Sequence, residues 1–339
     1  MKALNSFSQI FVDLSKCNLC LKCIDACPQQ LFKIEKGKVI VPDADNCLGC
    51  MNCVKVCPMH AITLQFSGIK KFFITKKCNN NCIMCFESYR NKVEDPTFKE
   101  IMEGMNSILT GHEKLIVLHG AEPTLRKDIF QILAYLRRYN VPIFFPTNGR
   151  MFAYRDFSKK LIELKLPLTI AFTILGVNEK THDAITRTPG SFKQTVQGLS
   201  NLSEMKYPGL TLKINYVILK QNFSEIFEMV KKFYTFVDEI QLSYVEPGGD
   251  AQANYSLLAP RFEELNLQFE ESFRFDSENK IFTKNIPLCY LSNSEKNLVF
   301  TLNQYREKIK KCEHCSFNQT CKGFWKQYLK VYPEVRKLK

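Results

Sequence analysis

Apolar residues in the central part of the chain follow two different periods in alternation. Short apolar runs that suit buried strands recur between segments with helical spacing. The strand-like runs are 69–75, 115–118, 142–146, 168–174, 212–219 and 240–245. Helical spacing is found over 98–109, at Phe130, Leu133, Leu136 and Tyr139, and after Ser224. Strand and helix thus alternate about six times over 69–250, which predicts a parallel sheet with right-handed crossovers.

The two ends of the chain have other patterns. Apolar stretches at 31–34 and 38–41 flank Gly37, which predicts a small hairpin. Residues 247–260 predict a linker, and 262–275 predict a helix. The basic end, 322–339, carries four interleaved aromatic residues: Phe324, Trp325, Tyr328 and Tyr332. A solvated amphipathic helix is the favoured interpretation of this end, and contact with RNA is the alternative.

Length and charge narrow the class of protein. No run approaches 18 apolar residues, and residues 1–10 lack a signal-peptide pattern, so we expect a cytoplasmic protein with no membrane partner.

The chain has 339 residues, of which 15 are cysteine. Disulfides do not persist in the cytosol, so clustered cysteines there indicate metal binding or catalysis. The net charge of +13 counts cysteines as neutral. Iron-bound thiolates would lower the charge to roughly +6, which weakens the case for nucleic acid.

Eight cysteines form two runs with the same spacing, C-x2-C-x2-C-x3-C-P. The first run is Cys17, Cys20, Cys23 and Cys27, and the second is Cys47, Cys50, Cys53 and Cys57. In bacterial ferredoxins with this spacing, the fourth cysteine of each run ligates the other cluster. We therefore expect one 4Fe–4S cluster on Cys17, Cys20, Cys23 and Cys57, and another on Cys47, Cys50, Cys53 and Cys27. Residues 10–64 resemble these ferredoxins, which implies electron transfer. Two zinc sites are the alternative, although zinc motifs usually present C-x2-C pairs.

A third group, Cys78, Cys82 and Cys85, follows a predicted strand with the spacing C-x3-C-x2-C. Three thiolates leave one iron of a cubane open, and an open coordination site is where chemistry takes place. The end of a parallel strand is also where barrel enzymes place their sites. This triplet resembles the cluster motif of the radical S-adenosylmethionine (SAM) superfamily, and an incidental cysteine cluster is the alternative. The resemblance implies that the open iron binds SAM, whose reductive cleavage gives a 5′-deoxyadenosyl radical that abstracts hydrogen from a substrate.

Segments further along the chain extend this resemblance. Residues 119–123 are similar to the superfamily's G-G-E-P segment, with alanine in place of the second glycine. The resemblance implies that Glu122 accepts from the SAM amino group, that Arg187 pairs with the SAM carboxylate, and that Met84 contacts adenine. The full set of SAM-binding candidates is Met84, Gly120, Ala121, Glu122, Pro123, Thr147, Asn148, Arg187 and Asn215. His182 and Asp183 can instead cap or brace a helix.

The remaining cysteines are Cys289, Cys312, Cys315 and Cys321. They resemble the SPASM or twitch extensions of radical SAM maturases, which implies one auxiliary 4Fe–4S cluster. A structural zinc ion is the competing occupant of such a four-cysteine set. With this group every cysteine in the chain is assigned. A fully ligated auxiliary cluster would tune or relay electrons rather than bind substrate.

Together these observations predict an α/β protein with a partial (β/α)6 TIM-like radical SAM barrel. A small α+β ferredoxin domain precedes the barrel and a short cysteine-rich extension follows it, with domains over 1–66, 67–250 and 251–339. The resemblance implies a radical SAM enzyme with an external electron donor and a peptide or protein substrate. A nucleoside, tRNA or cofactor precursor is the alternative substrate. An iron–sulfur electron carrier without SAM chemistry and a zinc-stabilised binding protein are the other classes of function.

Overall fold

The computed structural model describes residues 8–27, 30–42, 52–66, 68–86, 94–109, 113, 115–291, 298–299, 306–318 and 321–334. The chain divides into two compact units. The first unit comprises Asn5–Lys77 and Tyr89–Phe145, and the second comprises Met1–Leu4, Cys78–Ser88 and Pro146–Lys339. Among the described residues, no helix is long and apolar enough to cross a membrane. The domain boundaries expected from sequence remain predictions.

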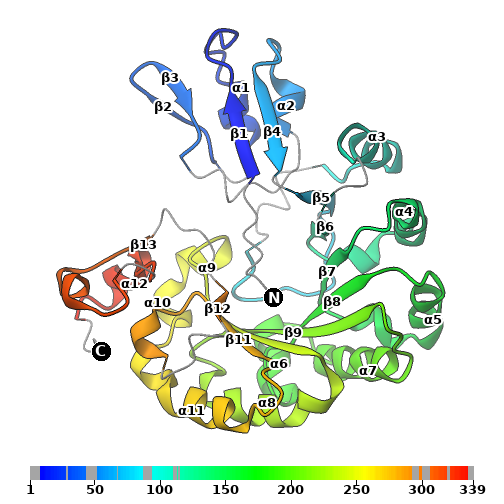
Figure 1. Ribbon diagram of the computed structural model, residues 1–339, viewed down its shortest axis with the longest axis vertical. Coiled ribbons are helices and arrows are strands. Elements are labelled where there is room, and N and C mark those ends of the chain that lie inside the picture. The colour runs from blue at the N-terminus through cyan, green and yellow to red at the C-terminus, as the bar shows by residue number, and fades with distance from the viewer. Residues whose placement is uncertain are drawn as a thin grey trace. The chain divides into compact units, whose positions relative to one another are not determined.

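The N-terminal part of the first unit is a small α+β module (Figure 1). Strand β1 (Ser8–Val12) pairs antiparallel with β4 (Ile62–Phe66), and β2 (Lys33–Glu35) pairs antiparallel with β3 (Lys38–Ile40). The β2–β3 turn at Lys36 and Gly37 has positive φ at both residues, which confirms the predicted hairpin. Two short helices complete the module, α1 (Lys22–Ala26) and α2 (Asn52–Val56).

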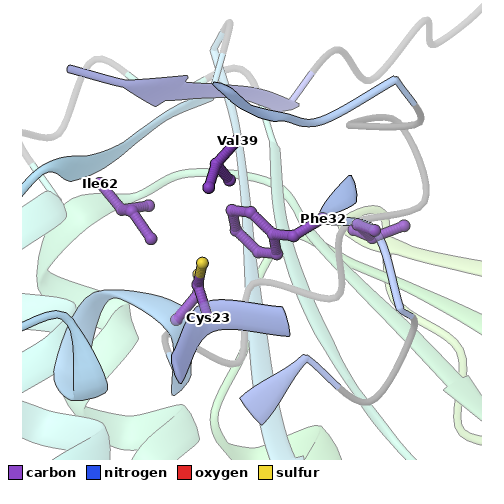
Figure 2. Packing of buried hydrophobic residues seen from close by; sticks show 6 residues of the cluster. Cys23, Phe32, Val39 and Ile62 are labelled. Carbon is purple, nitrogen blue, oxygen red and sulfur yellow. The ribbon is translucent and has the colours of Figure 1, made fainter. Parts of the chain in front are cut away.

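The core of this module is small, as Figure 2 shows for Cys23, Phe32, Val39 and Ile62. Leu31 and Cys53 complete the buried cluster, so two of its six members are predicted iron ligands. A module of this size buries little apolar surface, and bound metal commonly supplies the missing folding energy.

The rest of the first unit is a parallel α/β arrangement. Strands β5 (Ile69–Thr75), β6 (Leu115–Gly120) and β7 (Ile143–Thr147) are neighbours in that order. Helix α3 (Phe98–Ile108) begins with a capping box between Thr97 and Glu100. Helix α4 (Ile129–Leu136) lies between β6 and β7 in sequence, flanked by the 3-10 turns η3 (Pro123–Leu125) and η4 (Arg137–Tyr139).

The second unit continues the same alternation. Its parallel strands are ordered β8 (Leu168–Thr173), β9 (Leu210–Ile218), β10 (Glu239–Tyr244), β11 (Ile281–Lys284) and β12 (Leu298–Val299). The helices are α5 (Arg155–Glu163), α6 (Glu179–Thr186), α7 (Ser191–Glu204), α8 (Ile226–Phe233) and α11 (Asn266–Phe275), with 3-10 turns η5 (Arg150–Ala153), η6 (Phe223–Glu225), η7 (Tyr234–Phe236) and η8 (Phe262–Leu265). Helices α7, α8 and α11 lie along one side of these strands (Figure 1). The predicted α/β class with parallel strands is confirmed.

Two expectations need correction. Residues 247–260 are not an open linker, because they form α9 (Asp250–Ala253) and α10 (Tyr255–Leu258). Ala251, Tyr255 and Leu258 are buried there, so the segment belongs to the packed core. Strands β11 and β12 extend the sheet beyond the last strand predicted at 240–245.

The C-terminal extension is built from short elements. A 3-10 turn, η9 (Leu288–Tyr290), precedes β13 (Arg306–Glu307), which pairs antiparallel with β14 (Phe324–Trp325). Another turn, η11 (Lys310–His314), lies between these strands, and α12 (Lys326–Val331) follows them. The four aromatic side chains of this end are buried, at 1%, 4%, 2% and 8% exposure for Phe324, Trp325, Tyr328 and Tyr332. They are core residues, which leaves no exposed ring for stacking on RNA bases.

Candidate functional site

The N-terminal module encloses a cavity beside its first cysteine run. Cys17, Cys20, Cys23 and Cys57 all line this cavity. Cys57 comes from the second run, so the structure brings together the crossed set expected for the first cluster. The apolar side chains of Val12, Val39, Leu21, Met59 and Ile62 make up much of the remaining wall. For the other expected set, Cys47 and Cys50 lie outside the described residues, and Cys27 and Cys53 are described.

Backbone amides approach the fourth sulfur of both runs in the same way. Leu31 N donates to Cys27 Sγ at 3.5 Å, and Ala61 N donates to Cys57 Sγ at 3.3 Å. Each donor lies four residues after its cysteine, so the two halves of the module repeat the same local turn. Hydrogen bonds to cluster sulfurs are among the features that set reduction potential.

The third cysteine group lies on a loop of the second unit, residues 78–85, which we call the cysteine loop. Polar side chains after β7 hold its first half. Arg150 Nη1 donates to the carbonyl of Asn79 and, at 2.8 Å, to Asn80 Oδ1. Asn148 Nδ2 donates to Asn79 Oδ1 at 2.6 Å and lies 3.9 Å from Cys78 Sγ. Asn80 N also donates to Cys78 Sγ, at 3.3 Å.

The C-terminal end of α6 holds the middle of the cysteine loop. Asn81 N donates to Thr186 O at 3.0 Å, and Ile83 N donates to Ile185 O at 3.0 Å. Arg187 follows directly, exposed and in the left-handed conformation at φ 51°. The candidate Arg187 is thus next in sequence to a residue that anchors the loop.

Asp183 and His182 brace this region. Asp183 Oδ1 accepts from Phe192 N at 2.7 Å and from Ser191 Oγ at 2.8 Å, and Oδ2 accepts from Gly190 N at 2.5 Å, so the carboxylate caps α7. Burial alone would raise the pKa of Asp183, but these hydrogen bonds outweigh it and lower the pKa. His182 is 1% exposed and its Nδ1 accepts from Leu175 N at 3.2 Å. Burial lowers its pKa to about 4, so the imidazole is neutral near pH 7.

A glycine pair after β10 meets the last part of the cysteine loop. Asp250 N donates to Cys85 O at 2.9 Å. Gly249 has φ +57°, and a Cβ there would lie 2.3 Å from Cys85 O. Only glycine permits this approach, so Gly249 sets the position of the Cys85 backbone. Sequence reasoning placed this glycine in a linker.

The candidate segment 120–123 belongs to the first unit and is fixed by the end of β5. Gly120 has φ +143°, and a Cβ there would lie 2.2 Å from Thr75 O. Ala121 N donates to that same carbonyl at 2.9 Å, and Ala121 has negative φ. Alanine therefore causes no strain at the second position of the motif, whereas Gly120 is required.

Glu122 in this segment is fully buried, at 0% exposure. Its backbone N donates to Lys77 O at 2.8 Å, and its Oε1 accepts from Thr124 N at 3.1 Å and Thr124 Oγ1 at 2.5 Å. Pro123 opens η3 immediately after it. These contacts fix the orientation of the carboxylate before any ligand binds.

Asp95 and Arg126, which sequence reasoning missed, stiffen the end of β5. Asp95 accepts from Lys76 N at 2.6 Å and from Thr75 Oγ1 at 3.2 Å. Arg126 donates through Nη1 to Ile74 O and, at 2.8 Å, to Pro96 O, and its Nε pairs with Asp128 at 2.6 Å. The strand that leads into Cys78 is thus held by two charged residues of the first unit.

The other SAM-binding candidates have defined surroundings. Thr147 Oγ1 accepts from Gly149 N at 2.9 Å, and Met84 is half-buried in the cysteine loop. Asn215 Oδ1 accepts from Ser243 Oγ at 2.7 Å and from Gln241 Nε2 at 3.2 Å. In the register, Gln241 lies opposite Asn215, so these polar groups share one face of β9 and β10. Sequence reasoning found Asn215 but not its two partners on β10.

The last four cysteines lie in the C-terminal extension. Cys289 on η9 and Cys312 on η11 are buried, and Cys315 and Cys321 are half-buried. Burial, followed by the charges of Cys321, Cys315 and Cys312, raises the pKa of the Cys289 thiol to about 12. A bound metal group would stabilise the thiolate form of such a buried cysteine.

No three His, Cys, Asp or Glu side chains in the described part of the chain are arranged around a single metal ion. A cubane spreads its thiolates over separate irons, more widely than the ligand shell of one ion. The donor chemistry of the cysteine groups suits clusters.

Comparison with known proteins identifies the domains of the chain. The family model of the radical SAM superfamily matches residues 72–233. Two models of 4Fe-4S dicluster domains match residues 16–61 and 39–88. The chain therefore contains a radical SAM domain. Its radical SAM and dicluster domains imply SAM and 4Fe–4S clusters as cofactors.

Curated relatives of this radical SAM protein have several different activities. It is 29% identical over 172 residues to the Fe-coproporphyrin III synthase of Methanosarcina barkeri, a match that covers 48% of this chain and 41% of the relative. It is 25% identical over 201 residues to the mycofactocin maturase MftC of Mycolicibacterium smegmatis, covering 58% of this chain and 49% of that one. The chain spans about half the length of the curated relatives it matches.

Among solved structures, the radical SAM protein is similar to Streptococcus suis SuiB bound to S-adenosylmethionine. The TM-score is 0.50 at 14% identity, and the match covers 76% of this chain and 72% of that one. At this identity the likeness concerns the fold alone, and it agrees with the parallel α/β arrangement described above.

Proposed function

We propose that this radical SAM protein cleaves SAM reductively at the cysteine loop and abstracts hydrogen from a peptide or protein side chain. The observation that carries the proposal is the three-cysteine loop held by the residues after β7, by the end of α6 and by the glycine pair after β10. Cys78, Cys82 and Cys85 would ligate three irons, leaving the fourth for SAM. The bound cofactors would supply the 5′-deoxyadenosyl radical.

The protein's own part in this chemistry is positioning. Arg150 and Asn148 would keep the loop in one conformation, and a cluster ligand that shifts by an ångström can cost a large factor in rate. Glu122, buried and already oriented by Thr124, is our candidate acceptor for the SAM ammonium. Arg187 is our candidate for the SAM carboxylate, because its guanidinium is a strong carboxylate donor and it follows the loop anchor Thr186. Met84, Thr147 and Asn215 complete the proposed set.

Electrons would enter through the N-terminal module. Its dicluster family match and the cavity lined by Cys17, Cys20, Cys23 and Cys57 support a first cluster there. We propose that an external reduced protein or dye loads this module, which then reduces the cluster at the cysteine loop. We assign the second cluster to Cys47, Cys50, Cys53 and Cys27 on the ferredoxin spacing alone.

Support for a peptide substrate comes from the C-terminal extension. Its four cysteines are buried or half-buried, and they follow the radical SAM domain in sequence. The match to MftC, named a mycofactocin maturase, extends over 58% of this chain. An auxiliary cluster can take back an electron from the substrate radical, which would make the net reaction an oxidation or a bond-forming cyclisation.

A tetrapyrrole precursor is the second candidate substrate. Two relatives from Methanosarcina barkeri have names that refer to iron porphyrins. They are an Fe-coproporphyrin III synthase and an AdoMet-dependent heme synthase. Their matches cover 48% and 47% of this chain, less than the match to MftC.

Substrate-dependent formation of 5′-deoxyadenosine separates the candidates. Anaerobically reconstituted protein would receive SAM and dithionite together with short peptides encoded beside its gene, iron coproporphyrin, GTP or bulk tRNA. We expect a peptide to raise the rate and to return altered in mass. Stimulation by the porphyrin alone would replace the peptide with the second candidate. Salt-sensitive stimulation by tRNA would contradict both.

A further inference from the structure

Two buried nitrogen donors in the C-terminal extension have no acceptor. Arg306 Nε and Trp325 Nε1 are buried, and neither has a hydrogen-bond partner among the residues that the structure describes. Both groups can only donate. Leaving a buried donor unpaired is costly, so each one calls for an acceptor that binds nearby.

The two donors lie side by side. Arg306 on β13 is directly opposite Trp325 on β14, and its guanidinium carbon stands 4.4 Å from the indole centroid. The other guanidinium nitrogens are used, because Nη2 donates to Asn285 Oδ1 at 2.8 Å and Nη1 donates to Gly323 O at 3.2 Å. Only the edge that carries Nε lacks a partner.

This pair adjoins the four-cysteine site. Gly323, whose carbonyl binds Arg306, donates through its own N to Cys321 Sγ at 3.3 Å. Burial lowers the pKa of Arg306 to about 10, while the charges of Glu246 and Cys321 act in the opposite direction. Through Gly323, Arg306 is therefore connected to the Cys321 sulfur.

The charge on Arg306 also lacks a direct counter-ion. Glu246 belongs to the same hydrogen-bond network, but its Oε1 accepts from Lys284 at 2.9 Å and from Asn285 at 2.7 Å. The amide of Asn285 separates the Glu246 carboxylate from the guanidinium. Within the described residues Arg306 forms no ion pair of its own, and a buried cation in that state favours an anion beside it.

We propose that Arg306 and Trp325 donate hydrogen bonds to an anionic iron–sulfur group held by Cys289, Cys312, Cys315 and Cys321, and that they raise its reduction potential. This inference rests on the auxiliary cluster of the proposed function. A cubane with four thiolates is negatively charged, and its sulfur atoms accept hydrogen bonds. Reduction adds a further negative charge, so a nearby cation and two donors stabilise the reduced state more than the oxidised state.

A redox titration of the full-length protein tests the proposal. The auxiliary component is the electron paramagnetic resonance signal that Cys312→Ala removes while the other clusters remain. We expect Arg306→Gln to shift the midpoint of that component to lower potential, Arg306→Lys to shift it less, and Trp325→Phe to shift it least. Arg155→Gln is the matched control, since Arg155 pairs with Glu204 at the surface. Should Arg306→Gln fail to retain iron, the other two variants decide the test.

Iron content keeps this test separate from a failure of the proposed function. If Cys312→Ala loses no iron, or if the wild-type site holds zinc, there is no auxiliary cluster and both proposals fail. If the iron is intact and the midpoint is unchanged in all three variants, only the role of Arg306 and Trp325 is contradicted. Trp325 is the only tryptophan in the chain. Its fluorescence should therefore rise in Cys312→Ala if the cluster lies beside it, and an unchanged signal would oppose the proposal.

Discussion

The cysteine loop and the C-terminal cysteine site differ in the number of their cysteines, in the burial of these side chains and in the groups around them. The loop has three cysteines, all half-buried, and its neighbours are the amide and guanidinium groups of Asn148 and Arg150. The C-terminal site has four, two of them buried. Tyr290, which follows Cys289, packs against Phe262 and Phe324, whose ring centroids are 5.2 and 6.3 Å from its own.

The difference indicates the kind of chemistry that each site supports. A loop fixed through its backbone, with one ligand position left over, can admit a cofactor and hold it in a defined place. A four-thiolate site packed among aromatic rings has no position for substrate, and its burial and hydrogen bonds are features that set a potential. We interpret the first as the reactive centre and the second as an electron relay.

The largest expected effect separates these two roles. Cys312→Ala should abolish formation of modified product, because the relay is lost, yet it should still form 5′-deoxyadenosine within about tenfold of the wild type. Mass spectrometry of the substrate and chromatography of the nucleoside measure the two outcomes. Loss of both products in a protein that keeps its other iron would mean that the C-terminal site takes part in SAM cleavage.

The next effect concerns the end of the cysteine loop. Gly249→Ala places a Cβ 2.3 Å from Cys85 O at a positive φ, so the loop must move. We expect the rate of SAM cleavage to fall by about 100-fold, the scale of a one-ångström misplacement. Gly190→Ala is the matched control, because Gly190 also has positive φ but meets no atom within 4 Å. Equal losses in both variants would point to backbone strain and not to the contact with Cys85.

A smaller effect is expected at the beginning of the loop. Arg150→Gln removes charge-assisted bonds to Asn79 and Asn80, worth about 2 kcal/mol in total. If that energy is lost from the active conformation, the rate of SAM cleavage falls about 30-fold. Arg155→Gln breaks only an exposed pair with Glu204 and should leave the rate nearly unchanged. A wild-type rate in Arg150→Gln would show that the loop needs no such support.

The smallest expected effect is on the free energy of unfolding of the protein. Asp183→Ala removes the cap of α7 and should lower the free energy of unfolding by about 1 kcal/mol. The pKa of Asp183 is lowered from its ordinary value of 3.8, so its contribution is complete above that pH and disappears as pH falls through the folded-state value. Denaturant melts at pH 7 and pH 3 measure this. If the difference in the free energy of unfolding between variant and wild type grew on acidification, the role of Asp183 as the cap of α7 would be contradicted.

Local patterns allowed much of the fold to be predicted. The strand predicted at 69–75 has the bounds of β5, and its residues 72–75 are all buried. The helix at 98–109 was visible because its apolar residues repeat at helical spacing, whereas its cap at Thr97 is seen only in the structure. Strand β11 was missed because Ile281–Lys284 is four residues long, with two apolar residues followed by two polar ones.

The cysteines of the candidate sites were visible from spacing alone, but their supports were not. Arg150, Asp95 and Arg126 are single charged residues whose partners lie far away in sequence, so no local pattern marks them. Gly249 was misplaced in a linker, because glycine pairs are typical of flexible turns as well as of close backbone contacts. Trp325 looked like part of a basic, aromatic tail, and its burial distinguishes it from a residue of a solvated helix. Arg306 is a single charged residue that no sequence pattern marks.

Formation of 5′-deoxyadenosine is the direct test of SAM cleavage at the cysteine loop. Wild-type protein and Cys85→Ala, both reconstituted anaerobically and analysed for iron, would be incubated with SAM, dithionite and each candidate substrate. We predict 5′-deoxyadenosine from the wild type, none above background from the variant, and about sixteen irons per wild-type chain. Absence of 5′-deoxyadenosine from fully loaded wild-type protein with every substrate would contradict SAM cleavage, and an electron-transfer role would then take its place.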